Sequence, residues 1–274
     1  MMTPDTQNLK GVIVCADDFA VNESASLGIA QLARQGRISA TSAMVLSPRW
    51  PQDVALLHDL RGQLAVGLHL DWTSEFAVGS GHGLSLGKAM LKAALGGFDI
   101  EAARAVIEHQ LDAFEAHWQA PPDYVDGHQQ VQQFAGIREA LVQALASRYG
   151  HQQAKPYLRI SRAPPGTADL KAKVIAAMGA SAIEIIAASA RITCGKGLLG
   201  IYDFTGSAER YAGLMAGWLH NAPAGSIIMC RPALSAESGD SIGAARAQEF
   251  AYLSSDEFPK ALATAGVALL AQPA

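Results

Sequence analysis

The feature that most constrains the fold is a regular alternation of short apolar runs with longer helical patterns along the 274-residue chain. Eight of the apolar runs are interpreted as short buried strands. They lie at residues 11–16, 39–46, 63–70, 124–126, 157–160, 198–201, 226–230 and 267–270. Helical patterns fill most of the intervals, among them one from the N-cap Asn22 to Gly36 and others at residues 50–60, 102–118 and 137–148.

Strands separated by helices imply parallel pairing with right-handed crossovers. Seven or eight such units suit a (β/α) TIM-like barrel, which takes about 250 residues. No internal repeat, low-complexity segment or linker divides the chain, and residues 121–122 and 164–167 are expected to be loops. The sequence therefore predicts an α/β fold with a single, irregular barrel domain over residues 1–274.

The composition restricts the partners and the compartment. Charged residues make up 17% of the chain and the net charge is −4, so neither nucleic-acid binding nor a membrane-surface role is expected. Cys15, Cys194 and Cys230 form no closely spaced pair, which is typical of a reducing compartment. No signal-peptide pattern is visible, and no apolar run reaches the ~18 residues that span a bilayer. The cytoplasm is the expected location.

Functional side chains of a parallel barrel gather at the carboxyl ends of its strands. The first predicted strand ends directly before Asp17 and Asp18. Two adjacent carboxylates at the end of a buried strand repel each other unless a cation or a proton lies between them. A pair of capping residues ahead of the next helix is the alternative interpretation. The position of the pair on the strand favours a functional role.

The third predicted strand directs His69 towards the barrel interior. Residues 65, 67 and 69 share a face of small side chains and the imidazole, whereas residues 66, 68 and 70 share an aliphatic face that suits packing under helices. A hydrogen-bonded core histidine is the alternative interpretation. The register places His69 at the open end of the interior.

The fourth predicted strand adds Asp126 and, if it extends that far, His128 on the same side. Asp126 then either orients His128 or forms a hydrogen bond elsewhere. One carboxylate and two imidazoles from three strand ends form a ligand set that suits Zn²⁺, Fe²⁺ or Ni²⁺ and leaves positions open for water. Non-haem iron oxygenases use the same ligand types, although the βα alternation opposes their antiparallel scaffold.

The remaining histidines are interpreted as residues of helices, loops or the surface: His58, His82, His109, His117, His151 and His220. The Gly-rich stretch at residues 78–87 is expected to be a loop, either covering the substrate or simply connecting elements. No P-loop, GxSxG or strand-linked GxGxxG motif is present, so nucleotide binding and serine hydrolysis have no sequence support.

Three ordered motifs resemble those of the YdjC-like carbohydrate deacetylases, a family with chitooligosaccharide deacetylases and a hopanoid-biosynthesis-associated branch. The motifs are CADDFA at residues 15–20, GLHL at 67–70 and VDGH at 125–128. Further matching stretches at residues 158–160, 200–204, 229–232, 249–253 and 262–270 extend the resemblance from about residue 11 to 271. The resemblance therefore covers nearly the whole chain.

The resemblance implies a (β/α)-barrel hydrolase that removes acetyl groups from N-acetylated sugars with one divalent metal ion, Mg²⁺ or Zn²⁺. By analogy, Asp18, His69 and His128 bind the metal, and Asp17 is the base that takes a proton from the attacking water. Gln130, Arg159 and Tyr202 are expected to bind the substrate, since a glutamine can hold a substrate hydroxyl.

The sequence also departs from the family pattern. Arg231 stands in MCRP, at residues 229–232, where the family carries the proton-donating histidine, and arginine cannot act as a general acid. Gln130 and Gln132 stand where histidines are usual, and Ala20 replaces a glycine. The metal-binding set is complete but the proton-transfer set is reduced, which predicts a rate lower by ~10²–10⁴. The alternative is that another residue or bulk water protonates the leaving group. Arg231 is expected to stabilise an oxyanion or to bind an anionic substrate group.

Three hypotheses follow. The first is a metal-dependent hydrolase of an N-acetylated sugar or related amide, with reduced activity. The second is a non-catalytic or strongly impaired carbohydrate-binding descendant of the family. The third is a different metal reaction on the same scaffold. The expected partner is a small carbohydrate, and a homodimer is expected only because such assemblies are common.

Overall fold

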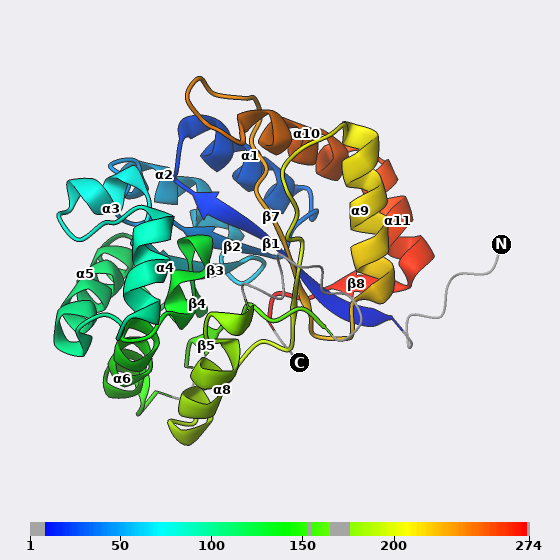
Figure 1. The fold of residues 1–274 in the computed structure, drawn as a ribbon. Coiled ribbons are helices and arrows are strands. Elements are labelled where there is room, and N and C mark those ends of the chain that lie inside the picture. Colours follow the sequence, from blue (N-terminus) through cyan, green and yellow to red (C-terminus); the bar gives the residue numbers. More distant parts are fainter. Residues whose placement is uncertain (1–8, 153–154, 165–175, 273–274) are drawn as a thin grey trace.

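The computed structural model describes residues 9–152, 155–164 and 176–272 (Figure 1). Strands and helices alternate along the chain as predicted. The strands are β1 (Lys10–Phe19), β2 (Ala40–Ala43), β3 (Ala65–Leu70), β4 (Tyr124–Gly127), β5 (Tyr157–Leu158), β6 (Leu198–Leu199), β7 (Ile227–Cys230) and β8 (Val267–Leu269). They form one parallel sheet in the order β5-β4-β3-β2-β1-β7-β6, with β8 pairing with the start of β1.

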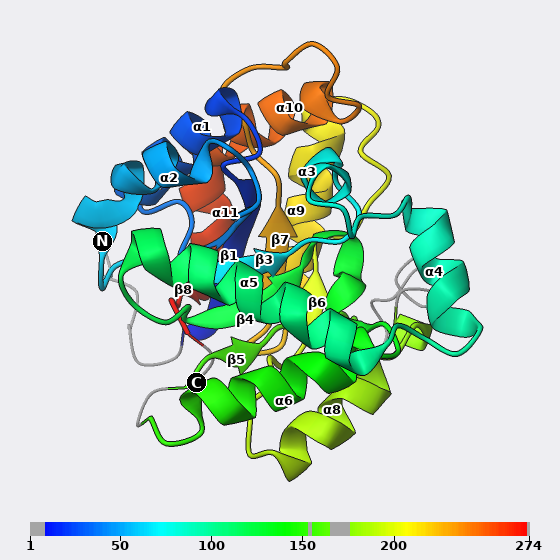
Figure 2. The ribbon, with the colours of Figure 1, turned by 90° about the vertical axis from the view of Figure 1, so that its left-hand side faces the viewer.

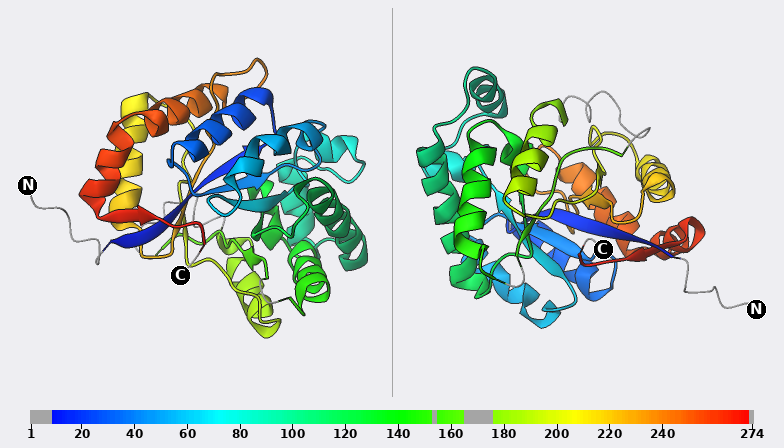
Figure 3. Two further views of the ribbon diagram at one scale, coloured as in Figure 1. Left: turned by 180° about the vertical axis from the view of Figure 1, so that it is seen from behind. Right: turned by 90° about the horizontal axis from the view of Figure 1, so that it is seen from below.

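Helices cover the outside of this curved sheet, and Figures 2 and 3 show them from three further directions. They are α1 (Glu23–Arg34), α2 (Trp50–Asp53), α3 (Glu75–Gly79), α4 (Leu86–Ala94), α5 (Ile100–Trp118), α6 (Ile137–Tyr149), α8 (Ala180–Ser189), α9 (Ala208–Asn221), α10 (Gly243–Ser254) and α11 (Glu257–Ala265). Two 3₁₀ helices, Val54–Leu60 and His128–Gln133, complete the described elements. The side chain of Asn22 caps α1 by accepting a hydrogen bond from the Ala25 N–H, as predicted.

The prediction of an α/β fold with a parallel sheet is confirmed, but the closed barrel is wrong. The seven strands from β5 to β6 form a half-barrel, and no ladder joins the two edge strands. Instead, backbone hydrogen bonds link Leu158 to Thr193 and to Gly195. At Gly200, with φ +93°, the chain passes so close to Met229 that a Cβ would lie 2.1 Å from its carbonyl oxygen. β6 ends directly before this glycine, at Leu199, two residues earlier than predicted.

Two apolar layers lie on the two faces of the sheet. The inner layer contains Ile13, Cys15, Ala40, Ala65, Tyr124, Tyr157, Leu198, Ile227 and Met229. The outer layer, which packs under the helices, includes Val66, Leu68 and Leu70. The predicted two faces of β3 are therefore confirmed. This register brings alternate residues of each strand to the interior.

Several predicted boundaries need correction. The predicted helix at 50–60 is α2 followed by a 3₁₀ helix, and the predicted loop at 78–87 contains the end of α3 and the start of α4. The loop at 121–122 is confirmed, whereas most of 164–167 lies outside the described residues. None of the described helices has both the length and the apolar character needed to cross a bilayer. The single domain over residues 1–274 stays a prediction.

Gly67 is expected to be intolerant of a side chain. A Cβ at this position would lie 2.4 Å from the buried Tyr124 ring, whose hydroxyl is held by Ser42 at 2.9 Å. Gly67→Ala should therefore lower the free energy of unfolding by about 1–3 kcal/mol. Urea unfolding would measure the change. Gly213→Ala, in the exposed face of α9 where a Cβ meets no neighbour, is the control and should instead stabilise the chain by up to about 1 kcal/mol.

Candidate metal centre and active site

Asp17 and Asp18 lie within β1, not after it as predicted. The pairing of β1 with β2 loses its register between Ala16 and Phe19, and Asp18 has φ +68°. Successive strand residues normally face opposite sides, but a bulge of this kind redirects one of them. Both carboxylates consequently reach the same open end of the sheet, where both contact the guanidinium of Arg231.

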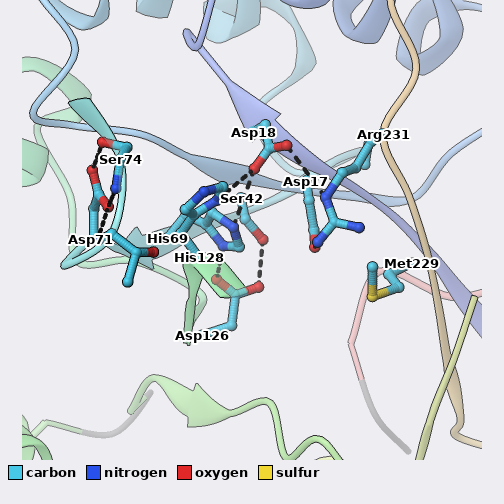
Figure 4. A network of polar contacts seen from close by, with 12 residues as sticks. Asp17, Asp18, Ser42, His69, Asp71, Ser74, Asp126, His128, Met229 and Arg231 are labelled. Carbon is cyan, nitrogen blue, oxygen red and sulfur yellow. Dashed lines mark hydrogen bonds and ion pairs between the residues drawn. The ribbon is translucent and has the colours of Figure 1, made fainter. Parts of the chain in front are cut away.

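Asp18, His69 and His128 converge at this end (Figure 4). Oδ1 of Asp18 lies 3.3 Å from Nε2 of His69 and 3.2 Å from Nδ1 of His128. One ligand atom of each of the three residues lies within 4.8 Å of the other two. The structure therefore brings together the three residues that the sequence analysis assigned to a metal. Whether they bind one stays a prediction.

Asp126 orients His69 rather than His128, which settles the alternative left open by the sequence. Its Oδ1 lies 2.5 Å from Nδ1 of His69, and its Oδ2 accepts a hydrogen bond from Ser42 at 2.6 Å. Burial by itself lowers the pKa of His69, but the carboxylates of Asp126, Asp18 and Asp17 together outweigh burial and raise that pKa to about 10. Nε2 of His69 is buried and makes no hydrogen bond within the described residues. This nitrogen faces Asp18 at 3.3 Å, and a divalent ion bound there would take the place of the proton that it carries without an ion.

His128 reaches the site from a loop. β4 ends at Gly127, so the strand does not extend to residue 128, and His128 begins a 3₁₀ segment. Gln129 and Gln130 then adopt φ values of +52° and +67°. The resulting turn places the His128 ring 5.6 Å from the His69 ring, centre to centre.

Two arginines contact the far oxygen of Asp18. Arg246 Nη2 donates to Oδ2 at 2.8 Å, and Arg231 Nε lies 3.3 Å from the same atom. Burial alone raises the pKa of the Asp18 carboxyl, but Arg246, the two imidazoles and Arg231 outweigh it and hold that pKa well below its usual range. Asp18 is therefore ionised, with Oδ1 towards the imidazoles and Oδ2 towards the arginines.

Arg159 holds the other aspartate. Its Nη1 and Nη2 donate to the two oxygens of Asp17 at 2.5 and 2.9 Å, and its Nη1 lies 2.8 Å from Asp126. Burial opposes ionisation of Asp17, but Arg159 outweighs burial and lowers the pKa of this carboxyl. Arg159 is fully buried, so the structure places it beneath the site, in contact with carboxylates. Its predicted role in substrate binding stays untested.

Helix α10 contributes two residues to the site that no sequence motif indicated. Arg246 bridges Asp18 to Asp240, and Glu249 accepts the Arg231 backbone N–H and the Tyr202 hydroxyl. The i, i+3 spacing of Arg246 and Glu249 indicates a shared helix face. The spacing alone does not indicate that this helix face packs against the carboxyl end of β1.

A cavity of about 860 Å³ opens beside Asp18 and His128, two of the three candidate ligands. Much of its wall is apolar, from Val21, Leu86, Met90, Met178, Ile201 and Phe204. Gln130 and Tyr202, both predicted to bind substrate, line the cavity. The amide oxygen of Gln130 accepts a hydrogen bond from Ser161, and the Tyr202 hydroxyl donates to Glu249 at 2.6 Å. Their substrate contacts stay predictions.

The residues present suit a divalent ion. Two imidazole nitrogens and a carboxylate oxygen are common ligands of Zn²⁺ and related ions, and they leave positions open for water. The unbonded Nε2 of His69 and the carboxylate on its other nitrogen form the arrangement in which a histidine binds a metal. Asp18, His69 and His128 would hold the ion.

Asp126→Asn should weaken binding of a divalent ion by about 10–100-fold, because the carboxylate that orients His69 and raises its basicity is lost. Isothermal titration of the variant with Zn²⁺ would measure the change. Asp123→Asn, whose carboxylate contacts a backbone N–H at the opposite end of β4, is the control. An unchanged affinity in Asp126→Asn would contradict the assigned role.

The fold and the site together define a class of protein: a parallel α/β half-barrel with an Asp-His-His candidate metal centre at the carboxyl ends of its strands. The model of the YdjC-like protein family matches residues 11–264. The chain belongs to the YdjC-like family.

Two curated relatives are chitooligosaccharide deacetylases. The one from Enterobacter sp. (strain 638) is 30% identical over 166 residues, which is 57% of this chain and 66% of that protein. The one from Serratia marcescens is 29% identical over 158 residues, 53% of this chain and 62% of that protein. The matched regions thus span slightly less than two thirds of the relatives.

Solved structures share the fold. A protein of Enterococcus faecalis V583, provisionally named a cellobiose-phosphate cleavage protein, superposes with a TM-score of 0.70 at 20% identity, covering 96% of this chain and 97% of that one. The Bc1960 peptidoglycan N-acetylglucosamine deacetylase gives a TM-score of 0.51 at 12% identity, covering 96% and 86%. At these identities the likeness concerns the architecture alone.

Proposed function

We propose that this protein is a metal-dependent hydrolase that removes the acetyl group from an N-acetylated carbohydrate. The observation that carries the proposal is the convergence of Asp18, His69 and His128 beside the ionised Asp17. Membership of the YdjC-like family and the names of the two curated relatives support a carbohydrate substrate. Mg²⁺ and Zn²⁺ are the ions that we expect.

A bound divalent ion supplies Lewis acidity for the acetyl carbonyl and lowers the pKa of a water molecule. Asp17 takes the proton of the attacking water, because its carboxylate is ionised and lies next to Asp18 in β1. Arg159 is a positioning residue that fixes both oxygens of Asp17. Asp126 likewise fixes the imidazole of His69 through Nδ1.

Arg231 lines the cavity and contacts both aspartates. Its Nη2 lies 3.6 Å from Oδ2 of Asp17, and its guanidinium lies 5.2 Å from the centre of the Phe204 ring. Arginine cannot donate a proton as a general acid at ordinary pH, so the amine must leave with little protonation assistance. We therefore expect slow cleavage of the amide bond.

Release of acetate from N-acetylglucosamine oligosaccharides, with and without a chelator, tests the proposal. The expected result is slow release that requires Mg²⁺ or Zn²⁺ and stops when the ion is removed. No release of acetate with any ion, accompanied by measurable sugar binding, would favour the alternative: an impaired carbohydrate-binding descendant. Oxygen uptake with Fe²⁺ would instead indicate a different metal reaction.

Arg231→His should raise the rate of amide hydrolysis by about 10²–10⁴, the contribution of a general acid. If amide hydrolysis is undetectable in the unaltered protein and appears in Arg231→His, the natural site has lost its proton donor and with it its activity. Loss of an existing activity in this variant would show that Arg231 takes part in the reaction. Acetate release from the same oligosaccharides measures both outcomes.

The cellular setting is also a proposal. Cys15, Cys194 and Cys230 are free thiols in the described structure, which supports action in the reducing cytoplasm. A homodimer stays a prediction.

A further inference from the structure

The leaving group determines whether an acetyl hydrolase must supply a proton or must stabilise a negative charge. An amide nitrogen needs a proton before its bond to carbon breaks, because the amide anion is too basic to leave. An ester oxygen can leave as an alkoxide, a much weaker base, if positive charge and hydrogen-bond donors stabilise it. A site with a cation but without a proton donor therefore favours esters over amides.

The acidic and basic side chains that line the cavity offer no positioned proton donor to a nitrogen. Among the described lining residues, these side chains are Asp18, His128, Arg231, Asp240 and Arg246. Asp18 and His128 belong to the candidate metal centre, and Asp240 accepts from Arg246 at 2.7 Å. The arginines keep their protons. Asp17 is a poor source of a proton for an intact amide, because Arg159 donates to both of its oxygens.

Arg231 has the properties of an oxyanion-stabilising group. Its backbone N–H donates to the buried Glu249, which anchors the residue at the end of β7. Its guanidinium lies 3.3 Å from Asp18 and 3.6 Å from Asp17, but it makes no side-chain hydrogen bond within the described residues. Its side chain is 9% exposed and lines the cavity. N–H donors therefore remain available to an oxygen that enters from the cavity.

We infer that the site hydrolyses O-acetyl esters of sugars, faster than N-acetyl amides, with Arg231 stabilising the departing alkoxide. This second activity rests on the proposed function, since it uses the same site and the same attacking water. It names a substrate class, the O-acetylated sugar, that the names of the curated relatives do not include.

The ester reaction balances without a further reactant. Asp17 takes one proton from water as the water oxygen bonds to the acetyl carbon. The bond between that carbon and the sugar oxygen then breaks, and its electron pair stays on the sugar oxygen. Arg231 donates hydrogen bonds to this alkoxide, which takes a proton from solvent water, and Asp17 returns its proton to the hydroxide that forms. The products are the sugar alcohol and acetic acid, which ionises in solution.

The test uses two substrates that differ in one atom group: methyl 2-O-acetyl-glucoside and methyl 2-acetamido-2-deoxy-glucoside. Release of acetate from each is measured with the whole chain loaded with Zn²⁺ or Mg²⁺. We expect the unaltered protein to have the higher kcat/KM on the ester. Arg231→Met should lower ester hydrolysis by about 10²–10³, the loss expected for one oxyanion donor. Arg231→Lys, which keeps the positive charge, should retain part of the ester hydrolysis activity.

Arg231→His serves as the reciprocal variant, because it exchanges an oxyanion donor for a proton donor. It should raise amide hydrolysis by about 10²–10⁴ and change ester hydrolysis by much less. Arg34→Met, which removes a surface arginine paired with Asp59, is the control for unspecific effects. Circular dichroism and metal content confirm that each variant is folded and loaded.

The outcomes separate this inference from the proposed function. Amide hydrolysis as fast as ester hydrolysis in the unaltered protein would overturn the inference and leave the proposed function intact. So would unchanged ester hydrolysis in a folded Arg231→Met variant. Cleavage of neither substrate by the unaltered protein or by Arg231→His would overturn both.

Discussion

A His69→Ala/His128→Ala double variant is expected to bind no divalent ion, whereas the unaltered chain binds about one. The two imidazoles are two of the three candidate ligands, and Asp18 alone cannot replace them because its Oδ2 already contacts Arg246 and Arg231. Metal content after equilibrium dialysis against Zn²⁺, Mg²⁺, Mn²⁺ and Ni²⁺ measures the difference. Acetate release should disappear together with the ion.

A matched double variant controls for the loss of two histidines. His109→Ala/His220→Ala removes two exposed imidazoles from α5 and α9 and should keep the ion. His69 is fully buried, so thermal unfolding must show that the site variant is folded at the temperature of dialysis. An ion retained by the folded site variant would place the metal elsewhere. No ion in any of the proteins would make a sugar-binding descendant the better interpretation.

Asp17→Asn is expected to lower acetate release by about 10²–10⁴ while the ion is retained. The amide cannot accept a proton from the attacking water, but Asp18, His69 and His128 are unchanged. Measuring kcat/KM and metal content on the same preparation distinguishes the loss of a base from the loss of the ion. The variant also leaves Arg159 with fewer carboxylate contacts, because only Asp126 remains beside it.

The chain offers a second ion pair with a buried aspartate as a control for that structural cost. Asp53 is buried and accepts from Arg49 at 2.9 and 3.1 Å on the outer, helical side. Removing one partner of such a pair is destabilising, so Asp53→Asn should lower the melting temperature without lowering acetate release. Equal losses of activity in the two variants would contradict the assignment of Asp17 as the base.

Much of the site was predictable because the responsible residues lie in short motifs at strand ends. Period-two alternation in β3 placed His69 in the interior, and the structure confirms that face. The position of Asp17 and Asp18 after an apolar run indicated the same end of the sheet. The resemblance to the family supplied the expected roles of these residues and showed that Arg231 departs from the family pattern. In the structure, Arg231 contacts the carboxylates of Asp17 and Asp18.

Other parts were not predictable because they depend on contacts between distant segments. Arg246 donates a hydrogen bond to Asp18 although the two residues are 228 positions apart in the sequence. The residues next to either of them in the sequence give no indication of this contact. The choice of Asp126 for His69 depends on the register between β3 and β4, which pairs these two residues directly. The bulge that turns Asp18 towards the site likewise becomes visible only in the ladder between β1 and β2.

The sequence by itself determined the parallel α/β class, the inward face of β3 and the residue types at the carboxyl ends. These properties are local, because side-chain period and chain order are sufficient to specify them. Only the tertiary structure decided that the sheet stays a half-barrel, that α10 supplies Arg246 and Glu249, and that Arg231 lies between Asp17 and Asp18. Those outcomes depend on how the sheet curves and on which buried charges it brings within a few ångströms of one another. The strength of an interaction between two charges depends on their distance in space, not on their separation along the chain.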